Sequence, residues 1–152
     1  MIVELTAAEQ LQGAIVGAMR HIQGARRADF YGASQANAWQ IDIEGALGEM
    51  AVAKAKGIYW SGDIGRTDTP DVGKLQVRTT RRDNGRLILH KRDSDDEIFI
   101  LATGENGTYN LKGWLLGYVG KRDEYWTDPV GGRAAYFVPQ AELNDMKNLK
   151  WE

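Results

Sequence analysis

The chain has 152 residues, of which 43% are hydrophobic and 26% are charged, and this predicts one folded domain over residues 1–152. With 19 basic and 21 acidic residues it lacks the basic excess of proteins that coat nucleic acid, so such binding requires a local patch. The absence of cysteine excludes disulfides, zinc–thiolate sites and thiol nucleophiles. No apolar run approaches the roughly 18 residues of a membrane span, and the N-terminus has no secretion-signal pattern. We therefore expect a cytoplasmic protein without a membrane partner.

The first part of the chain predicts two helices. Thr6–Glu9 has the form of a capping box, and a stripe of apolar residues at helical spacing follows as far as Gly24. Residues 24–40 are rich in small and polar side chains and are interpreted as a connection. A second helix is predicted over about Asp42–Lys56, with Gly57 directly after its end. The apolar stripe of the first helix consists of Leu11, Ile15, Met19 and Ile22.

Beyond Gly57 the hydrophobic period changes from helical to two, which predicts strands. Turn sequences such as Asp83–Gly85 separate them at hairpin spacing, and a short helix over about Pro139–Leu149 is expected at the end. This order predicts an α+β fold, with a mixed, mostly antiparallel sheet flanked by helices. The predicted strands are Ile58–Trp60, Lys74–Thr80, Arg86–His90, Glu97–Thr103, Tyr109–Val119, Glu124–Trp126 and Ala134–Val138.

Five residues in the middle of the chain form a candidate metal and phosphate site. Glu49 lies beside the apolar stripe of the second predicted helix, and Asp71 lies at the mouth of the strand that contains Gln76 and Arg78. Mg²⁺ and Mn²⁺ prefer hard oxygen ligands, which the two carboxylates, the Gln76 side chain and the Val77 carbonyl would supply. The guanidinium of Arg78 would hold a phosphate through a bidentate fork. Each residue also has a simpler interpretation, as a solvated helix flank, a turn or an exposed sheet face.

Over about residues 42–80 this pattern resembles the PD-(D/E)XK nuclease superfamily, and the small size is similar to members carried by phages and other mobile elements. The pattern consists of Gly48-Glu49 on a helix, then Pro70-Asp71, then Gln76-Val77-Arg78 on a strand. The resemblance implies a restriction-endonuclease-like fold and Mg²⁺-dependent hydrolysis of DNA phosphodiester bonds. It assigns as catalytic residues Glu49 (the helix acid), Asp71 (the metal-binding aspartate), Gln76 (the second acid position) and Arg78 (the lysine position).

Two of these positions depart from the pattern of the superfamily. Gln76 removes one negative charge from the metal site, and Arg78 stays charged at every accessible pH, so it cannot act as a general base. The alternative is therefore a catalytically inactive protein that keeps the nuclease fold and binds nucleic acid or another protein. Many relatives act as homodimers, which makes a homodimer a further expectation, although no interface is identified.

Basic residues are concentrated in residues 74–92, where seven basic side chains accompany one acid. This segment is interpreted as a surface for the nucleic-acid backbone or, more simply, as a solvated hairpin. Asp93–Glu97, which follows it, is expected to be a solvated turn. A third hypothesis, a carbohydrate- or partner-binding surface, requires Trp114 and Trp126 to be exposed on one face. The nucleic-acid-binding candidates are Arg81, Arg82, Arg86, Lys91 and Arg92.

Overall fold

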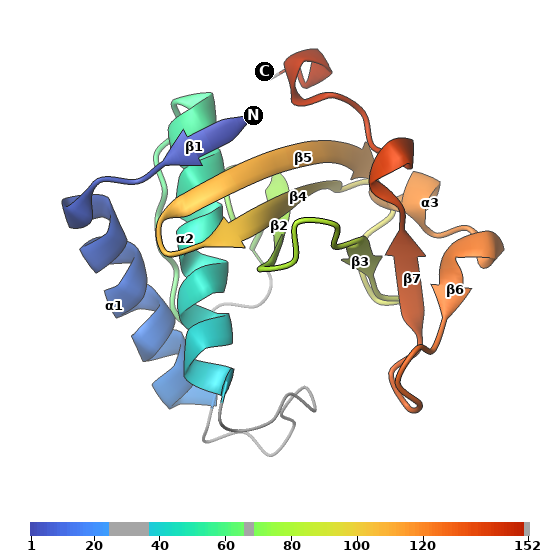
Figure 1. Ribbon diagram of the computed structural model, residues 1–152, viewed down its shortest axis with the longest axis horizontal. Coiled ribbons are helices and arrows are strands. Elements are labelled where there is room, and N and C mark those ends of the chain that lie inside the picture. The colour runs from blue at the N-terminus through green and yellow to red at the C-terminus, as the bar shows by residue number, and fades with distance from the viewer. Residues whose placement is uncertain (25–36, 66–68, 151–152) are drawn as a thin grey trace.

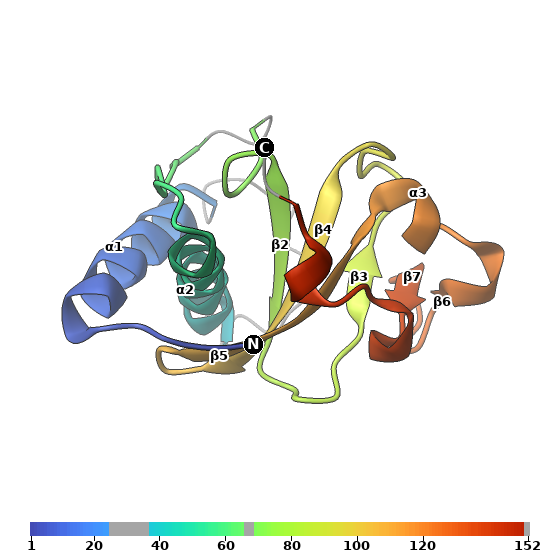
Figure 2. The ribbon, with the colours of Figure 1, turned by 90° about the horizontal axis from the view of Figure 1, so that it is seen from above.

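Two helices, a four-stranded sheet and a three-stranded sheet lie in successive layers (Figures 1 and 2). The computed structural model describes residues 1–24, 37–65 and 69–150. Helices α1 (Ala7–Gly24) and α2 (Ala38–Lys56) cover one face of the larger sheet, with α2 between α1 and the strands. The smaller sheet packs against the other face. Among the described residues, no helix combines the length and the apolar character that crossing a bilayer requires.

The larger sheet is mixed, and one of its edge strands runs parallel to its neighbour. Its order is β1–β5–β4–β2, in which only the β2–β4 pair is parallel. The smaller sheet has the antiparallel order β3–β7–β6. This arrangement confirms the predicted α+β class with a mixed, mostly antiparallel sheet and flanking helices. The strands are β1 (Ile2–Glu4), β2 (Leu75–Thr80), β3 (Leu87–Leu89), β4 (Ile98–Glu105), β5 (Thr108–Leu116), β6 (Trp126–Thr127) and β7 (Ala135–Val138).

Alternation along the strands of the larger sheet produces two hydrophobic cores. Leu75 and Val77 of β2 and Ile100 of β4 pack toward α2. Phe99 and Leu101 of β4 point the other way and pack against the smaller sheet. Because successive side chains alternate between the faces of a strand, the side chains of β2 between its buried residues also point toward the smaller sheet.

Helix α2 is buried along most of its length, which small side chains make possible. It ends as predicted at Gly57, whose φ of 65° is the left-handed conformation that glycine adopts most readily. It begins at Ala38, earlier than the predicted start at Asp42. The Asp42 carboxylate does not cap the helix but lies 2.9 Å from Nδ1 of His21 on α1. The sheet approaches closely at Gly48, where a Cβ would lie 2.0 Å from Thr79 Oγ1 of β2. Three alanines of the helix are at most 2% exposed, namely Ala46, Ala51 and Ala53.

Helix α1 packs on α2 through glycines and leaves its apolar stripe exposed. The predicted capping box forms, with Thr6 N–H donating to Glu9 at 2.7 Å and Glu9 N–H donating to Thr6 Oγ1 at 3.2 Å. The buried residues of α1 are Gly13, Gly17 and His21. Because the two glycines have no side chains, the axes of α1 and α2 approach closely. This contact determines which face of α1 is buried, and the apolar stripe stays exposed.

Gly17→Val is expected to lower the free energy of unfolding by about 3 kcal/mol, because the two helices must move apart. A Cβ on Gly17 would lie 2.4 Å from Cα of Ile43, a backbone atom that cannot rotate away. Gly45 of α2 is the matched control, since nothing lies within 4 Å of its Cβ position. Gly45→Ala is expected to raise the free energy of unfolding by about 0.5–1 kcal/mol. Urea denaturation measures both, and equal destabilisation would contradict the close helix contact.

The structure corrects several of the predicted elements. Residues 58–60 form no strand. Strand β3 pairs with β7 in the smaller sheet, so the expected hairpin between β2 and β3 is wrong. Residues 139–149 form two short 3₁₀ turns rather than one helix, because Asn144 between them exchanges backbone hydrogen bonds with Trp114 at 2.9 and 3.0 Å. The segment that follows β5 forms the short helix α3 (Gly117–Gly120), where the predicted strand Tyr109–Val119 was expected to continue. The predicted connection over 24–40 lies largely outside the described residues.

Candidate functional site

Two carboxylates lie together where α2 meets the open edge of β2. Glu49 of α2 is 6% exposed. Asp71 precedes a tight turn in which Val72 and Leu75 exchange backbone hydrogen bonds of 2.8 and 3.0 Å. This turn places the Asp71 carboxylate beside β2, where Oδ2 accepts a 2.7 Å hydrogen bond from the Val77 N–H. The structure therefore brings the two acids that the sequence singled out into one neighbourhood.

The backbone of Val77 faces the same place. Its N–H donates to Asp71 and not to β4, so it points to the open edge of the sheet. In an extended strand the N–H and C=O of one residue point to the same side. The Val77 carbonyl is therefore directed to the edge where Asp71 lies, as the metal site expected from the residue pattern requires.

A guanidinium from α1 completes this neighbourhood, and the sequence analysis did not identify it. Arg20 forms a bidentate ion pair with Glu49, with N···O distances of 2.6 and 3.0 Å. Nε of Arg20 donates to the Asp63 carbonyl at 2.9 Å, and the indole of Trp60 donates to Glu49 at 3.1 Å. Arg20 is the only arginine or lysine of α1, and this single basic residue was the feature of the sequence that could have identified it as a partner for a buried acid. We call Arg20, Glu49, Asp71 and Val77 the edge cluster.

Burial makes the two carboxylates of the edge cluster hold protons more tightly than usual. Burial, with the charge on Asp71, raises the pKa of Glu49 from 4.5 to about 7, although Arg20 opposes the shift. Burial also raises the pKa of Asp71, against the opposing effects of the Val77 N–H, Arg78 and Arg20. Two desolvated acids that repel each other gain most from an additional positive charge, whether a proton or a cation.

The free energy of unfolding is expected to fall as the pH rises from about 4.5 to about 7 in EDTA, by up to about 3 kcal/mol from Glu49. The sign follows because the folded-state pKa lies above the unfolded one, so the folded chain binds more protons in this range. Above about pH 7 the contribution becomes constant. Chemical denaturation at several pH values measures the slope. Glu49→Gln, which cannot titrate, should remove most of it, and an unchanged slope would contradict the assignment to Glu49.

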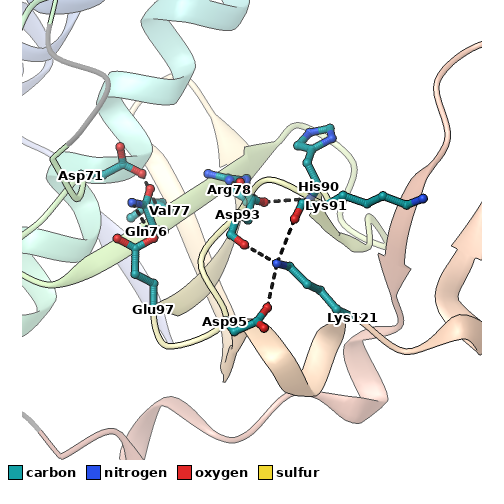
Figure 3. A network of polar contacts seen from close by, with 10 residues as sticks. All are labelled: Asp71, Gln76, Val77, Arg78, His90, Lys91, Asp93, Asp95, Glu97 and Lys121. Atoms are coloured by element: carbon teal, nitrogen blue, oxygen red, sulfur yellow. Dashed lines mark hydrogen bonds and ion pairs between the residues drawn. The ribbon is translucent and has the colours of Figure 1, made fainter.

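Gln76 and Arg78 point away from α2, toward the smaller sheet. Gln76 donates to Glu97 at 3.2 Å, and Arg78 pairs with Asp93 at 3.0 Å (Figure 3). The Arg78 guanidinium also lies over the Phe99 ring. Arg78 acts on the edge cluster only from this second face, where its charge lowers the pKa of Asp71. The four predicted catalytic residues therefore surround the edge of β2 and do not line one face of the sheet.

The edge cluster fits a divalent cation in part. No group of three or more His, Cys, Asp or Glu side chains that could hold a metal ion occurs in the described parts of the chain. Mg²⁺, however, usually keeps several waters and needs only one or two carboxylates from the protein. Asp71, Glu49 and the Val77 carbonyl would supply that share. Because Arg20 occupies both Glu49 oxygens, binding through Glu49 requires Arg20 to release one of them.

The acidic loop after β3 is held by a lysine. Figure 3 shows the ammonium of Lys121 pointing into the loop, where it donates to the carbonyls of Lys91 and Asp93 and to the Asp95 carboxylate. Asp93 also accepts from the His90 N–H at 2.8 Å and from Arg78. Residues 94–96 are exposed, as the predicted solvated turn requires, and Asp93 beside them is held in place as the partner of Arg78.

The predicted nucleic-acid-binding residues are exposed, but they form two groups rather than one surface. Arg81, Arg82 and Arg86 lie between β2 and β3, and the first two line an open cavity of about 350 Å³ beside the start of α2. Lys91 and Arg92 follow β3, roughly 16 Å farther along an extended chain. The second group directly precedes Asp93, the partner of Arg78.

The two tryptophans of the aromatic hypothesis do not share a face. Trp114 packs against the α2 side of the larger sheet, and its indole donates to the Asp145 carbonyl at 3.1 Å. Trp126 belongs to the smaller sheet, where it contacts the Tyr136 ring and lies 4.5 Å from the Lys91 ammonium. The surface required for carbohydrate or partner binding through these two residues is therefore absent.

Comparisons with protein-family models, with curated proteins and with solved structures found no match to this chain. The function is therefore inferred from the geometry of the edge cluster and from the residues around it.

Proposed function

We propose that this protein is a divalent-metal-dependent nuclease that hydrolyses nucleic-acid phosphodiester bonds, with DNA as the expected substrate, as a divergent PD-(D/E)XK member. The observation that carries the proposal is the pair of carboxylates, buried Glu49 and half-buried Asp71, at an open strand edge toward which the Val77 carbonyl also points. Both have pKa values raised by burial, so the folded chain holds them at a cost that a bound cation would offset. The expected cytoplasmic location and the relation to mobile elements belong to the same proposal.

Each residue of the site has a separate role in this proposal. Glu49, Asp71 and the Val77 carbonyl hold Mg²⁺ or Mn²⁺, with Gln76 contributing through water. When bound, such a cation lowers the pKa of a coordinated water and stabilises negative charge on the phosphate. Arg78, on the other side of the strand edge, holds the non-bridging phosphate oxygens. Lys91 and Arg92, next along the chain to the partner of Arg78, contact the backbone beyond the cleaved bond.

The second candidate is a nuclease-fold protein that binds nucleic acid or protein without cutting. The observation that favours it is the ion pair between Arg20 and Glu49, which occupies both oxygens of the helix acid. In this case binding to nucleic acid weakens steeply with salt and does not change when a metal is added.

Cleavage assays distinguish the two candidates. The folded protein is incubated with supercoiled plasmid, single-stranded DNA, branched DNA and RNA, in Mg²⁺, Mn²⁺ or EDTA. The proposal expects cutting of at least one DNA substrate in the presence of metal and none in EDTA. Salt-sensitive binding to the same substrates without cutting under any metal would establish the second candidate instead.

A further inference from the structure

The outward face of α1 is apolar and carries no charge. Its stripe remains largely accessible, with Leu11 63%, Ile15 55%, Met19 40% and Ile22 42% exposed. The other exposed residues of α1, which is described in full, are Ala7, Ala8 and Gln12. A surface helix ordinarily turns its apolar stripe to the core and its charged residues to water, so α1 has the reverse orientation.

The titratable side chains of α1 all pair with α2. Glu9 pairs with Lys54 at 2.8 Å, Arg20 with Glu49, and His21 with Asp42. The glycine contact with α2 fixes this orientation, because rotating the stripe inward would place branched side chains where Gly13 and Gly17 now lie. The exposed stripe is therefore a stable property of the fold and not a consequence of a loosely placed helix.

The stripe has the spacing of a helix–helix interface. Three stripe residues and two alanines beside them, exposed Ala8 and half-buried Ala18, follow one another at alternating intervals of three and four residues, which is the repeat of a coiled-coil seam. In order they are Ala8, Leu11, Ile15, Ala18 and Ile22. Beside the C-terminal end of α1, Trp39 is 48% exposed and its ring lies 4.0 Å from that of His21, which extends the apolar surface.

We propose that α1 is the interface of a symmetric homodimer, in which the α1 helices of two copies pack antiparallel. Centred on Ile15, this pairing places Leu11 opposite Met19 and Ala8 opposite Ile22, so larger side chains meet smaller or flexible ones. Two copies of an uncharged face meet without like charges opposing each other, whereas a face with charges of one sign would repel its own copy. A membrane surface fits less well, since helices that lie on lipid carry Lys or Arg on their polar face, and the single Arg of α1 is paired with Glu49.

The dimer is expected to be of moderate strength. An 18-residue helix is about 27 Å long, and one such helix pair covers less than the about 800 Å² per partner of a standard stable interface. The dissociation constant should therefore lie in the micromolar range, with Trp39 adding to the contact.

Sedimentation velocity over about 5–200 µM tests the dimer. The full chain is expected to shift from monomer to dimer over this range, and Ile15→Glu should raise the dissociation constant at least about tenfold by placing a carboxylate at the centre of each face. Val130→Glu, at a residue 68% exposed outside α1, is the control that leaves dimerisation unchanged. Circular dichroism verifies that each variant is folded.

Cysteine crosslinking tests the orientation, because the chain contains no other cysteine. Ile15→Cys is expected to form a disulfide-linked dimer under mild oxidation, whereas Val130→Cys stays monomeric. Ala8→Cys should not crosslink to its own copy, which lies roughly 21 Å away in the antiparallel pair. Three results would overturn the inference. The chain could stay monomeric at every concentration, the dimer could be unaffected by Ile15→Glu, or α1 could bind anionic vesicles instead of its copy. Equal crosslinking through residues 8 and 15 would overturn the antiparallel arrangement.

Discussion

Asp71→Asn is expected to reduce metal-dependent cleavage at least about 100-fold, the largest effect of any single substitution in the site. A bound metal contributes several kcal/mol to transition-state stabilisation, and each 1.36 kcal/mol corresponds to a factor of ten in rate. The Asn side-chain oxygen still accepts from the Val77 N–H, so the turn before β2 and the fold should be retained. Single-turnover cleavage at saturating Mg²⁺ measures the loss.

The matched control for this substitution is Asp83→Asn. Asp83 is also an aspartate in the middle of the chain, but its side chain is 87% exposed and pairs with Lys112. Its replacement should leave cleavage within about twofold, since surface ion pairs contribute little. Equal losses in both variants would mean that general charge, and not the edge cluster, determines the activity.

Arg20→Met is expected to lower the free energy of unfolding by about 3 kcal/mol at pH 8, because it leaves the buried Glu49 carboxylate without its partner. At pH 5, below the raised pKa of Glu49, the carboxylate is protonated and the loss should be much smaller. Denaturation at the two pH values measures the difference. Equal loss at both would show that Arg20 acts through packing alone.

Two further variants isolate the ion pair. Arg20→Met combined with Glu49→Gln replaces both charges and should recover most of the stability at pH 8. Arg122→Met is the control, because its ion pair with Glu124 is exposed on both sides. If the edge cluster binds a cation, Mg²⁺ should also raise the melting temperature of Arg20→Met more than that of the unaltered chain, since Glu49 is then free to bind.

Local chemistry explains the parts of the fold that the sequence predicted. The capping box at Thr6 and Glu9 and the glycine that ends α2 involve residues close together in the chain, so their sequence pattern is sufficient. Most strands of the larger sheet were placed by their alternation. The turn at Asp83–Gly85 was correctly placed as a break but wrongly as a hairpin, since the pairing of β3 with β7 depends on residues some fifty positions away.

The candidate site was predicted in its parts but not in its arrangement. The residue types and order of Glu49, Asp71 and Val77 indicated a cation site, and these groups lie at the same strand edge. The partner of Glu49 was not predictable, because Arg20 is brought to it by the packing of two helices through Gly13 and Gly17.

The sequence by itself determined the positions of α1, α2 and three of the four strands of the larger sheet, and which side chains alternate to opposite faces of β2, because backbone preference and side-chain period are local properties. Only the tertiary structure decided that the apolar stripe of α1 faces outward and that Arg78 acts from the side of the sheet opposite Glu49. The physical reason is that the direction in which a helix or a strand turns its faces depends on what packs against it. The glycines of α1 and the second core beneath Phe99 are such partners, and neither acts through neighbours in the chain.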